Sequence, residues 1–207
     1  MDTLSNIIVN PVKAFNQLKE EDKFPVTTFI VLLALVLINM ILNVPITAKV
    51  SELVLSGMSL SEEQADMAIR MTHKMRYLSM VGGFVMYVIM LFVYPLILFV
   101  IARIFGAKLN YTKTLRLLIY CFIATAIGDL VNTAFVYFQG IDNIKSMYDT
   151  MMTGVNRFTS IENAGIFLYM FLGSINPFQI WLVVLLVIGV KIFTDSGWSK
   201  SFIVSFL

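Results

Sequence analysis

The chain has 207 residues, of which 58% are hydrophobic and only 14% are charged. This composition excludes an ordinary soluble domain, in which about a quarter of the residues are charged. The formal net charge of +2 is too small to indicate a nucleic-acid partner, and a single cysteine excludes a disulfide framework. We therefore expect one all-α integral membrane domain over residues 1–207.

Long uncharged stretches define the predicted membrane helices. The chain carries no charge for 25 residues after Lys23, for 26 after Arg76 and for 28 after Glu162. Because a crossing needs about 20 apolar residues, each stretch is long enough to span the hydrocarbon core. A fourth stretch, 117–141, is interrupted only by Asp129. We predict a polytopic fold of four to five membrane helices plus short amphipathic helices, with spans at about 24–44, 78–104, 115–138 and 177–193.

A short helix is predicted before the first span. Asn10 is a suitable N-cap, and Pro11 suits the first helical position. Ala14, Phe15 and Leu18 then fall on one helical face. Two interpretations stand: an amphipathic helix on the membrane surface, or a lead-in to the first span, which we expect to end at Pro45.

The polar segment after the first span begins the next helix. Ser61 and Gln64 have the spacing of a capping box, which predicts a helix start near Glu62. This helix is expected to run unbroken into the second span and to kink at Pro95. Methionines follow at helical spacing, as an adaptable contact surface or as ordinary packing: Met67, Met71, Met75 and Met80.

The connection between the second and third spans is short and basic. It carries four basic residues and no acid: Arg103, Lys108, Lys113 and Arg116. Positive charge in short loops marks the cytoplasmic side, so we predict a cytoplasmic N-terminus. An attraction of this loop to anionic lipid head groups is the second interpretation.

The third span carries the candidate polar site. Ala124, Gly128 and Asn132 repeat every four residues, a small-xxx-small spacing that allows close helix approach. The adjacent row, on the same half of the helix, consists of Thr125, Asp129 and Thr133. The opposite half is mainly large and apolar, so we expect this span to pack against several other helices.

Asp129 has two interpretations, because a carboxylate near the bilayer centre costs about 2.5–3.5 kcal/mol on insertion scales. It is either a structural residue bonded to Asn132, Thr133, Asn39 or Tyr87, or part of a proton or ion path. One histidine and one cysteine do not provide a metal site or a catalytic pair of the usual kind. We therefore expect no enzyme activity, no catalytic residues, no metal and no cofactor.

The last uncharged stretch is interrupted by Asn176-Pro177, a pair that favours a break and a fresh helix start. The preceding residues, 164–175, are too few to cross alone. They form either an interfacial or re-entrant helix or the first half of a kinked crossing. The final apolar segment, 199–207, is also too short to cross.

Two boxes resemble the Yip family, membrane proteins named for interaction with Ypt/Rab GTPases, in its compact prokaryotic form. One box surrounds Pro11 and Phe15 ahead of the first span, and the other contains Pro177, Phe178 and Trp181 with Gly189 downstream. The resemblance covers nearly the whole chain. It implies a cytoplasmic N-terminus and five helices, although the segment after Lys200 is shorter than a fifth span. The long cytosolic region of eukaryotic relatives is missing, so GTPase binding is not carried over.

The resemblance implies no enzyme chemistry, and some bacterial relatives are thought to accompany ABC-type export systems. We expect a multi-pass protein of the cell membrane that acts as an adaptor or assembly/trafficking factor through helix–helix contacts, accessory to a transport or export complex. The expected partners are the lipid bilayer, other membrane proteins such as an ABC-type transporter, or further copies of the chain, and no nucleic acid. The alternative is a small transporter or permeability protein that uses Asp129.

Overall fold

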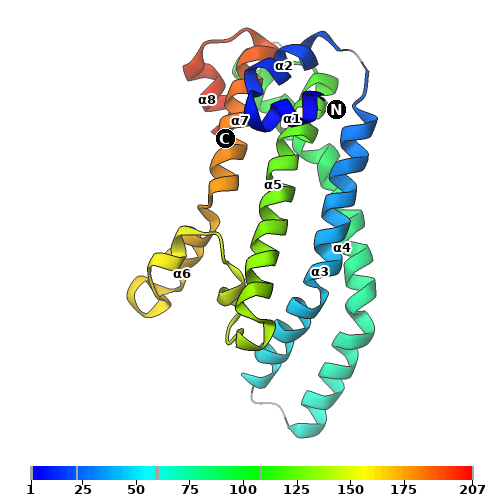
Figure 1. Ribbon diagram of the computed structural model, residues 1–207, viewed down its shortest axis with the longest axis vertical. Helices are drawn as coiled ribbons and strands as arrows, with labels where there is room; N and C mark the ends of the chain where they lie inside the picture. Colours follow the sequence, from blue (N-terminus) through cyan, green and yellow to red (C-terminus); the bar gives the residue numbers. More distant parts are fainter. Residues whose placement is uncertain (1, 22, 59–60, 108, 207) are drawn as a thin grey trace. The chain divides into compact units, whose positions relative to one another are not determined.

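The computed structural model describes residues 2–21, 23–58, 61–107 and 109–206 (Figure 1). Within these ranges every regular element is helical. Three short 3-10 turns, η1 (Ile141–Asn143), η2 (Met147–Thr150) and η3 (Val155–Phe158), separate the fifth and sixth helices. The helices are α1 (Asp2–Val9), α2 (Pro11–Glu20), α3 (Val26–Ser56), α4 (Glu62–Ile104), α5 (Tyr111–Gln139), α6 (Ile161–Ser174), α7 (Pro177–Thr194) and α8 (Trp198–Phe206).

Four of the described helices contain a stretch long and apolar enough to cross a membrane: Val26–Ser56, Lys74–Ile104, Tyr111–Gln139 and Pro177–Thr194. This confirms the predicted all-α, polytopic class. The helices exceed the predicted spans, since α4 alone has 43 residues and is therefore about 64 Å long. A bilayer with its head groups is about 40–45 Å thick, so the polar first part of α4 extends beyond the span.

Local signals at helix starts are confirmed. The Asn10 side chain accepts a hydrogen bond from the Lys13 amide at 3.1 Å, with Pro11 at the first helical position of α2. The Ser61 amide donates to Gln64 Oε1 at 3.1 Å, and the Gln64 amide donates to Ser61 Oγ at 3.3 Å. The predicted capping box therefore starts α4, which runs unbroken into the second span.

The expectation that the first span ends at Pro45 is wrong, because α3 continues through Pro45 to Ser56. Proline removes one backbone hydrogen bond and crowds the preceding turn. Membrane helices tolerate it where neighbouring groups satisfy the freed carbonyls. The carbonyl that Pro45 leaves without its helical donor is that of Ile41. The Tyr137 hydroxyl donates to the next carbonyl along, that of Leu42, at 2.7 Å, and so bonds α5 to α3 within the turn that contains the proline.

Pro95 lies inside α4 in the same way. The Tyr111 hydroxyl donates to the carbonyl oxygen of Phe92 at 3.1 Å. In both helices the accepting carbonyl stands three residues before the proline. The two tyrosines lie at opposite ends of α5, so α5 supplies a donor beside each proline.

The predicted restart at Asn176-Pro177 is confirmed. Helix α6 ends at Ser174, and α7 begins at Pro177. Helix α6 has 14 residues with a non-helical Gly165 inside it, at φ +73°, so it is at most about 21 Å long. Most of its large apolar side chains are exposed, among them Phe167 and Phe171. The Val155 amide donates to the Ile175 carbonyl at 3.0 Å, which ties the end of α6 to η3.

The contacts divide the chain into two compact units. The first unit comprises Met1–Ala34, Met86–Ile127 and Phe178–Leu207, and the second comprises Leu35–Val85 and Gly128–Pro177.

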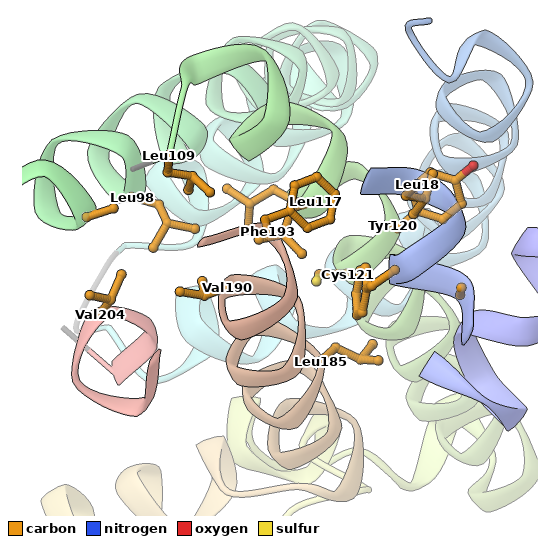
Figure 2. Packing of buried hydrophobic residues seen from close by; sticks show 14 of the residues in the cluster. Leu18, Leu98, Leu109, Leu117, Tyr120, Cys121, Leu185, Val190, Phe193 and Val204 are labelled. Atoms are coloured by element: carbon orange, nitrogen blue, oxygen red, sulfur yellow. The ribbon is translucent and has the colours of Figure 1, made fainter. Parts of the chain in front are cut away.

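The core of the first unit joins residues from both ends of the chain. Ala14, Phe15 and Leu18 of α2 are fully buried in it. Figure 2 shows Leu18 near Tyr120 of α5, and Phe193 of α7 beside Leu117. The predicted short helix ahead of the first span is therefore a separate helix, and its apolar face packs on protein.

Gly189 marks a close approach within this core. A Cβ atom at this position would overlap the Leu117 side chain of α5. Both residues are buried. The absence of a side chain at Gly189 is therefore what lets α7 approach α5.

The core of the second unit is smaller. Ile46 of α3, Val136 of α5 and Ile144 of the following loop are buried together. Half-buried residues surround them: Val50, Leu53, Ile141 and Met152. The loop after α5 therefore contributes to this core and is not a free connection.

Replacing Gly189 with alanine should destabilise the protein by about 1–3 kcal/mol, because the new methyl group overpacks the contact with Leu117. Thermal unfolding in detergent, followed by circular dichroism, measures the effect. The matched control is Gly82→Ala in α4, where no atom lies within 4 Å of the added Cβ. That variant should be unchanged or slightly more stable. Equal stability of the two variants would contradict the close-packing role.

Candidate functional site

The polar residues of α5 form the candidate site. Two thirds (67%) of the apolar window of this helix is buried, against 22% or less in each of the other three spans. The third span therefore packs against more protein than the other three candidate spans do. Every polar group on it must therefore find a partner inside the chain or outside it.

Thr133 is bonded inside the second unit. Its hydroxyl donates to Asn39 Oδ1 of α3 at 2.8 Å and accepts from Asn43 Nδ2 at 2.9 Å. Asn43 Nδ2 also donates to Asn39 Oδ1 at 3.0 Å. Thr133 is buried, and these three side chains link α3 to α5.

Asn132 holds the loop that follows α5. Its Nδ2 donates to the carbonyl of Thr150 at 2.8 Å. Its Oδ1 accepts from the amides of Met152 at 2.8 Å and Thr153 at 3.2 Å. One amide side chain thereby satisfies three backbone groups of a segment that lacks a regular ladder of hydrogen bonds.

The remaining small and hydroxyl residues of the two rows serve packing. Ala124 and Gly128 are buried, as the small-xxx-small spacing predicts for a contact face. Thr125 is half-buried, and its hydroxyl donates to the carbonyl of Phe122, one turn earlier in the same helix, at 2.8 Å. Thr125 therefore makes no link to a second helix through that bond.

Asp129 differs from all of them, because its side chain is exposed. No hydrogen bond or ion pair joins its carboxylate to another residue in the described part of the chain. The hydroxyl and amide groups of Thr133, Asn132 and Asn39 bond to other atoms. Of the partners expected for Asp129, none of Asn132, Thr133, Asn39 and Tyr87 bonds to it in the described ranges.

The exposure of Asp129 is local. Ala126, three residues earlier, and Thr133, four residues later, are both buried. Asp129 lies ten residues before the end of α5 at Gln139, or about 15 Å along the helix. An exposed carboxylate therefore stands well inside the span, with buried neighbours one turn to either side.

The residues of the two sequence boxes are structural. Pro11 starts α2, and Phe15 meets Phe193 of α7 edge to face at 6.4 Å. Pro177 starts α7, and Trp181 is half-buried against the same core. Phe178 is also half-buried, in the first turn of α7.

The first box is further tied to the chain's last quarter by an ion pair. Lys19 Nζ of α2 lies 2.7 Å from the Asp195 carboxylate, just after α7. Both side chains are more than a quarter exposed, so the pair contributes at most about 1 kcal/mol. The ion pair serves mainly to position the end of α2 next to the end of α7.

The basic residues of the connection between α4 and α5 lie in different environments. Arg116 is 2% exposed and donates to the carbonyl of Leu18, in the last turn of α2, at 3.4 Å. Arg103 and Lys113 instead line an open pocket of about 490 Å³. Lys108 lies outside the described residues. The basic loop is therefore not one uniform surface patch.

Sequence reasoning missed several residues of this arrangement. Asn43, Tyr111 and Tyr137 provide links between helices, and none of them was singled out. The available signal was Asn39 and Asn43, four residues apart on one face of an otherwise apolar span. The tyrosine partners had no local signal, because their acceptors lie 19 and 95 residues away.

No group of three or more histidine, cysteine, aspartate or glutamate side chains suited to a metal ion occurs among the residues described. Comparison with known proteins identifies a family. The family model described as the Yip1 domain matches residues 5–207. No curated protein and no solved structure matches the chain.

Replacing Asn132 with leucine should expose the amides of Met152 and Thr153 to hydrogen exchange, since their acceptor is removed. Each unmet donor costs about 1–3 kcal/mol when it stays buried, so protection of these amides should fall about tenfold or more. Hydrogen–deuterium exchange with mass spectrometry measures it. Unchanged protection would show that the loop is held by other contacts.

Replacing Thr133 with valine should destabilise the protein by about 0.6–1.7 kcal/mol, the range of hydrogen bonds between membrane helices. Stability in a mixed-detergent unfolding titration provides the measurement. Thr125→Val is the matched control, because its hydroxyl bonds only to its own helix. Similar losses in both variants would contradict the link between α3 and α5.

Proposed function

Because the chain belongs to the Yip1 domain family and exposes a lone carboxylate within a membrane span, we propose that it is a non-enzymatic membrane adaptor. In this proposal it acts as an assembly or trafficking factor through helix–helix contacts in the bilayer. Asp129 is the contact residue. The partner is a second membrane protein that supplies the hydrogen-bond donors which the described part of the chain does not.

The energetics of Asp129 support this proposal. A carboxylate near the bilayer centre costs about 2.5–3.5 kcal/mol on insertion scales, and such residues normally face other protein or water. The other polar side chains of the site, Asn132 and Thr133, have partners within the chain. Asp129 has none among the described residues. A donor from outside the chain removes this cost, and charge-assisted hydrogen bonds are the strong ones.

The outer part of α4 supports it independently. Met67, Met71 and Met75 are each more than half exposed and follow one another at four-residue spacing. This segment lies before or at the start of the candidate span Lys74–Ile104. Methionine is flexible and polarizable, which suits contact surfaces that adapt to a partner. The chain thus offers a second contact surface outside the hydrocarbon.

The proposed place of action is the cell membrane, with the N-terminus in the cytoplasm. With that orientation nine lysines and arginines fall in the inner segments and six in the outer ones, which agrees with the positive-inside rule. The partner is proposed to be part of a transport or export complex, such as an ABC-type transporter. Self-association through Asp129 is a competing outcome of the test below.

The test is photo-crosslinking in native membranes, with a photoreactive amino acid at Phe135, an exposed position on α5. We expect one defined crosslinked product containing another membrane protein. Asp129→Ala should reduce its yield tenfold or more, because a charge-assisted hydrogen bond is worth about 1.5–3 kcal/mol. Asp142→Ala removes the same charge from an exposed residue beyond α5 and should leave the yield unchanged.

Three results would overturn the proposal. A product containing only two copies of this chain would replace the adaptor with self-assembly. Equal loss in the Asp129 and Asp142 variants would remove Asp129 from the contact. Proton or ion flux in liposomes that Asp129→Asn abolishes, without loss of insertion, would establish the small-transporter alternative.

A further inference from the structure

We propose that the pocket between the end of α4 and the start of α5 binds the phosphate group of an anionic phospholipid. Two cations, Arg103 and Lys113, line this pocket, together with Gly106, Ala107, Leu109 and Asn110. None of the six lining residues is acidic. The site belongs wholly to the first unit of the chain and is separate from Asp129.

The end of α4 beside the pocket is closed by a helix cap. At the end of α4 the Gly106 amide donates to the carbonyl of Arg103 at 3.0 Å, and the Ala107 amide donates to that of Ala102 at 2.7 Å. This is the Schellman pattern, which needs a left-handed residue after the helix. Gly106 provides it at φ +67°, and Ala102 and Ala107 are both buried.

The start of α5 is held in the same way. Asn110 Oδ1 accepts from the Lys113 amide at 2.8 Å and so caps the helix. The backbone of Lys113 is therefore held in the first turn of α5. Capping hydrogen bonds therefore hold the end of α4, which carries Arg103, and the start of α5, which carries Lys113. Ordered backbone at these two residues lowers the entropy cost of binding.

The cationic side chains of the pocket are available. The Arg103 guanidinium lies 5.3 Å from the ring centre of Phe99, one turn earlier, which positions it without using its hydrogen-bond donors. Neither Arg103 nor Lys113 forms an ion pair with an acid in the described ranges. A third cation lies next to a lining residue of the pocket, since Lys200 Nζ of α8 donates to the Gly106 carbonyl at 2.9 Å.

The position along the spans identifies a lipid as the ligand. Arg103 is the penultimate residue of the span Lys74–Ile104, and Lys113 is in the first turn of the span Tyr111–Gln139. The pocket therefore lies at the head-group level of one leaflet. Ile104 and Phe105 beside it are exposed apolar residues. Lys191 Nζ lies 3.6 Å from the ring centre of the exposed Trp198, and tryptophan and lysine anchor proteins at this depth.

The size and charge of the pocket fit a phosphoglycerol head group. A volume of about 490 Å³ lies within the range of small-molecule sites. Arginine and lysine are the residues that bind phosphate in proteins. A zwitterionic lipid brings its own cation to the pocket, so an anionic lipid is preferred.

The experiment counts lipids bound to the purified full chain by native mass spectrometry. The probe is palmitoyl-oleoyl phosphatidylglycerol against the phosphatidylcholine with the same acyl chains. We expect one phosphatidylglycerol to be retained preferentially. The double variant Arg103→Gln/Lys113→Gln should bind it about 30-fold more weakly, which corresponds to about 1 kcal/mol for each basic residue at the membrane surface.

Two matched variants make the result specific. Arg70→Gln/Lys145→Gln removes one arginine and one lysine from exposed positions outside the pocket and should bind like the wild type. Arg103→Lys/Lys113→Arg keeps both charges and should retain most of the binding. Thermal unfolding of each variant in the same detergent checks that the fold is intact.

Several outcomes would overturn the proposal. An equal loss in the Arg70/Lys145 variant would show a general surface-charge effect. An equal affinity of the wild type for both lipids would show that no anionic site exists. Complete displacement of the lipid by millimolar inorganic phosphate would show a site for soluble phosphate instead.

Discussion

The structure depends on one constraint, that backbone polar groups in hydrocarbon must be satisfied within the protein. Two long helices contain a proline, Pro45 in α3 and Pro95 in α4, and each loses a backbone hydrogen bond there. Tyr137 and Tyr111 each donate to a carbonyl three residues before one of these prolines. Helix α5, which carries both tyrosines near its ends, thus bonds to each proline-containing helix close to its proline and is itself the most buried of the four candidate spans.

The same constraint separates the polar side chains of α5 into two kinds. Asn132 and Thr133 form their hydrogen bonds inside the chain. Asn132 bonds to the loop after α5, and Thr133 bonds to α3. Asp129 is placed between buried neighbours, yet it is exposed and makes no such bond in the described ranges. A polar side chain that is hydrogen-bonded within the chain stabilises the fold. A polar side chain in the same span without such a bond can instead bind a group outside the chain. The candidate site therefore consists of one residue, supported by the others.

Residues of the two sequence boxes also serve the fold. Phe15 and Phe193 pack edge to face, and Gly189 permits the approach of Leu117. They join the two ends of the chain in one core, so their pattern marks the fold and assigns no chemistry. The positive charges are also divided, because Arg116 is buried against the end of α2 while its neighbours at the ends of α4 and α5 face a pocket. A fold shared within a family leaves function to sites that each chain builds on it.

Length, apolar runs and capping residues determined the membrane class, the four crossings, the starts of α2 and α4 and the break at Pro177, because these depend on neighbours within one or two turns. Tertiary structure alone decided the continuation of α3 through Pro45, the burial of α2 in protein and the exposure of Asp129. The surroundings of each are distant in sequence: a tyrosine hydroxyl 95 residues away bonds to α3 in the turn before Pro45, residues from both chain ends form the core around α2, and Asn132 and Thr133 bond to groups other than Asp129. The local sequence shows which polar groups need a hydrogen-bond partner. Only the tertiary structure shows which of these groups have one within the chain.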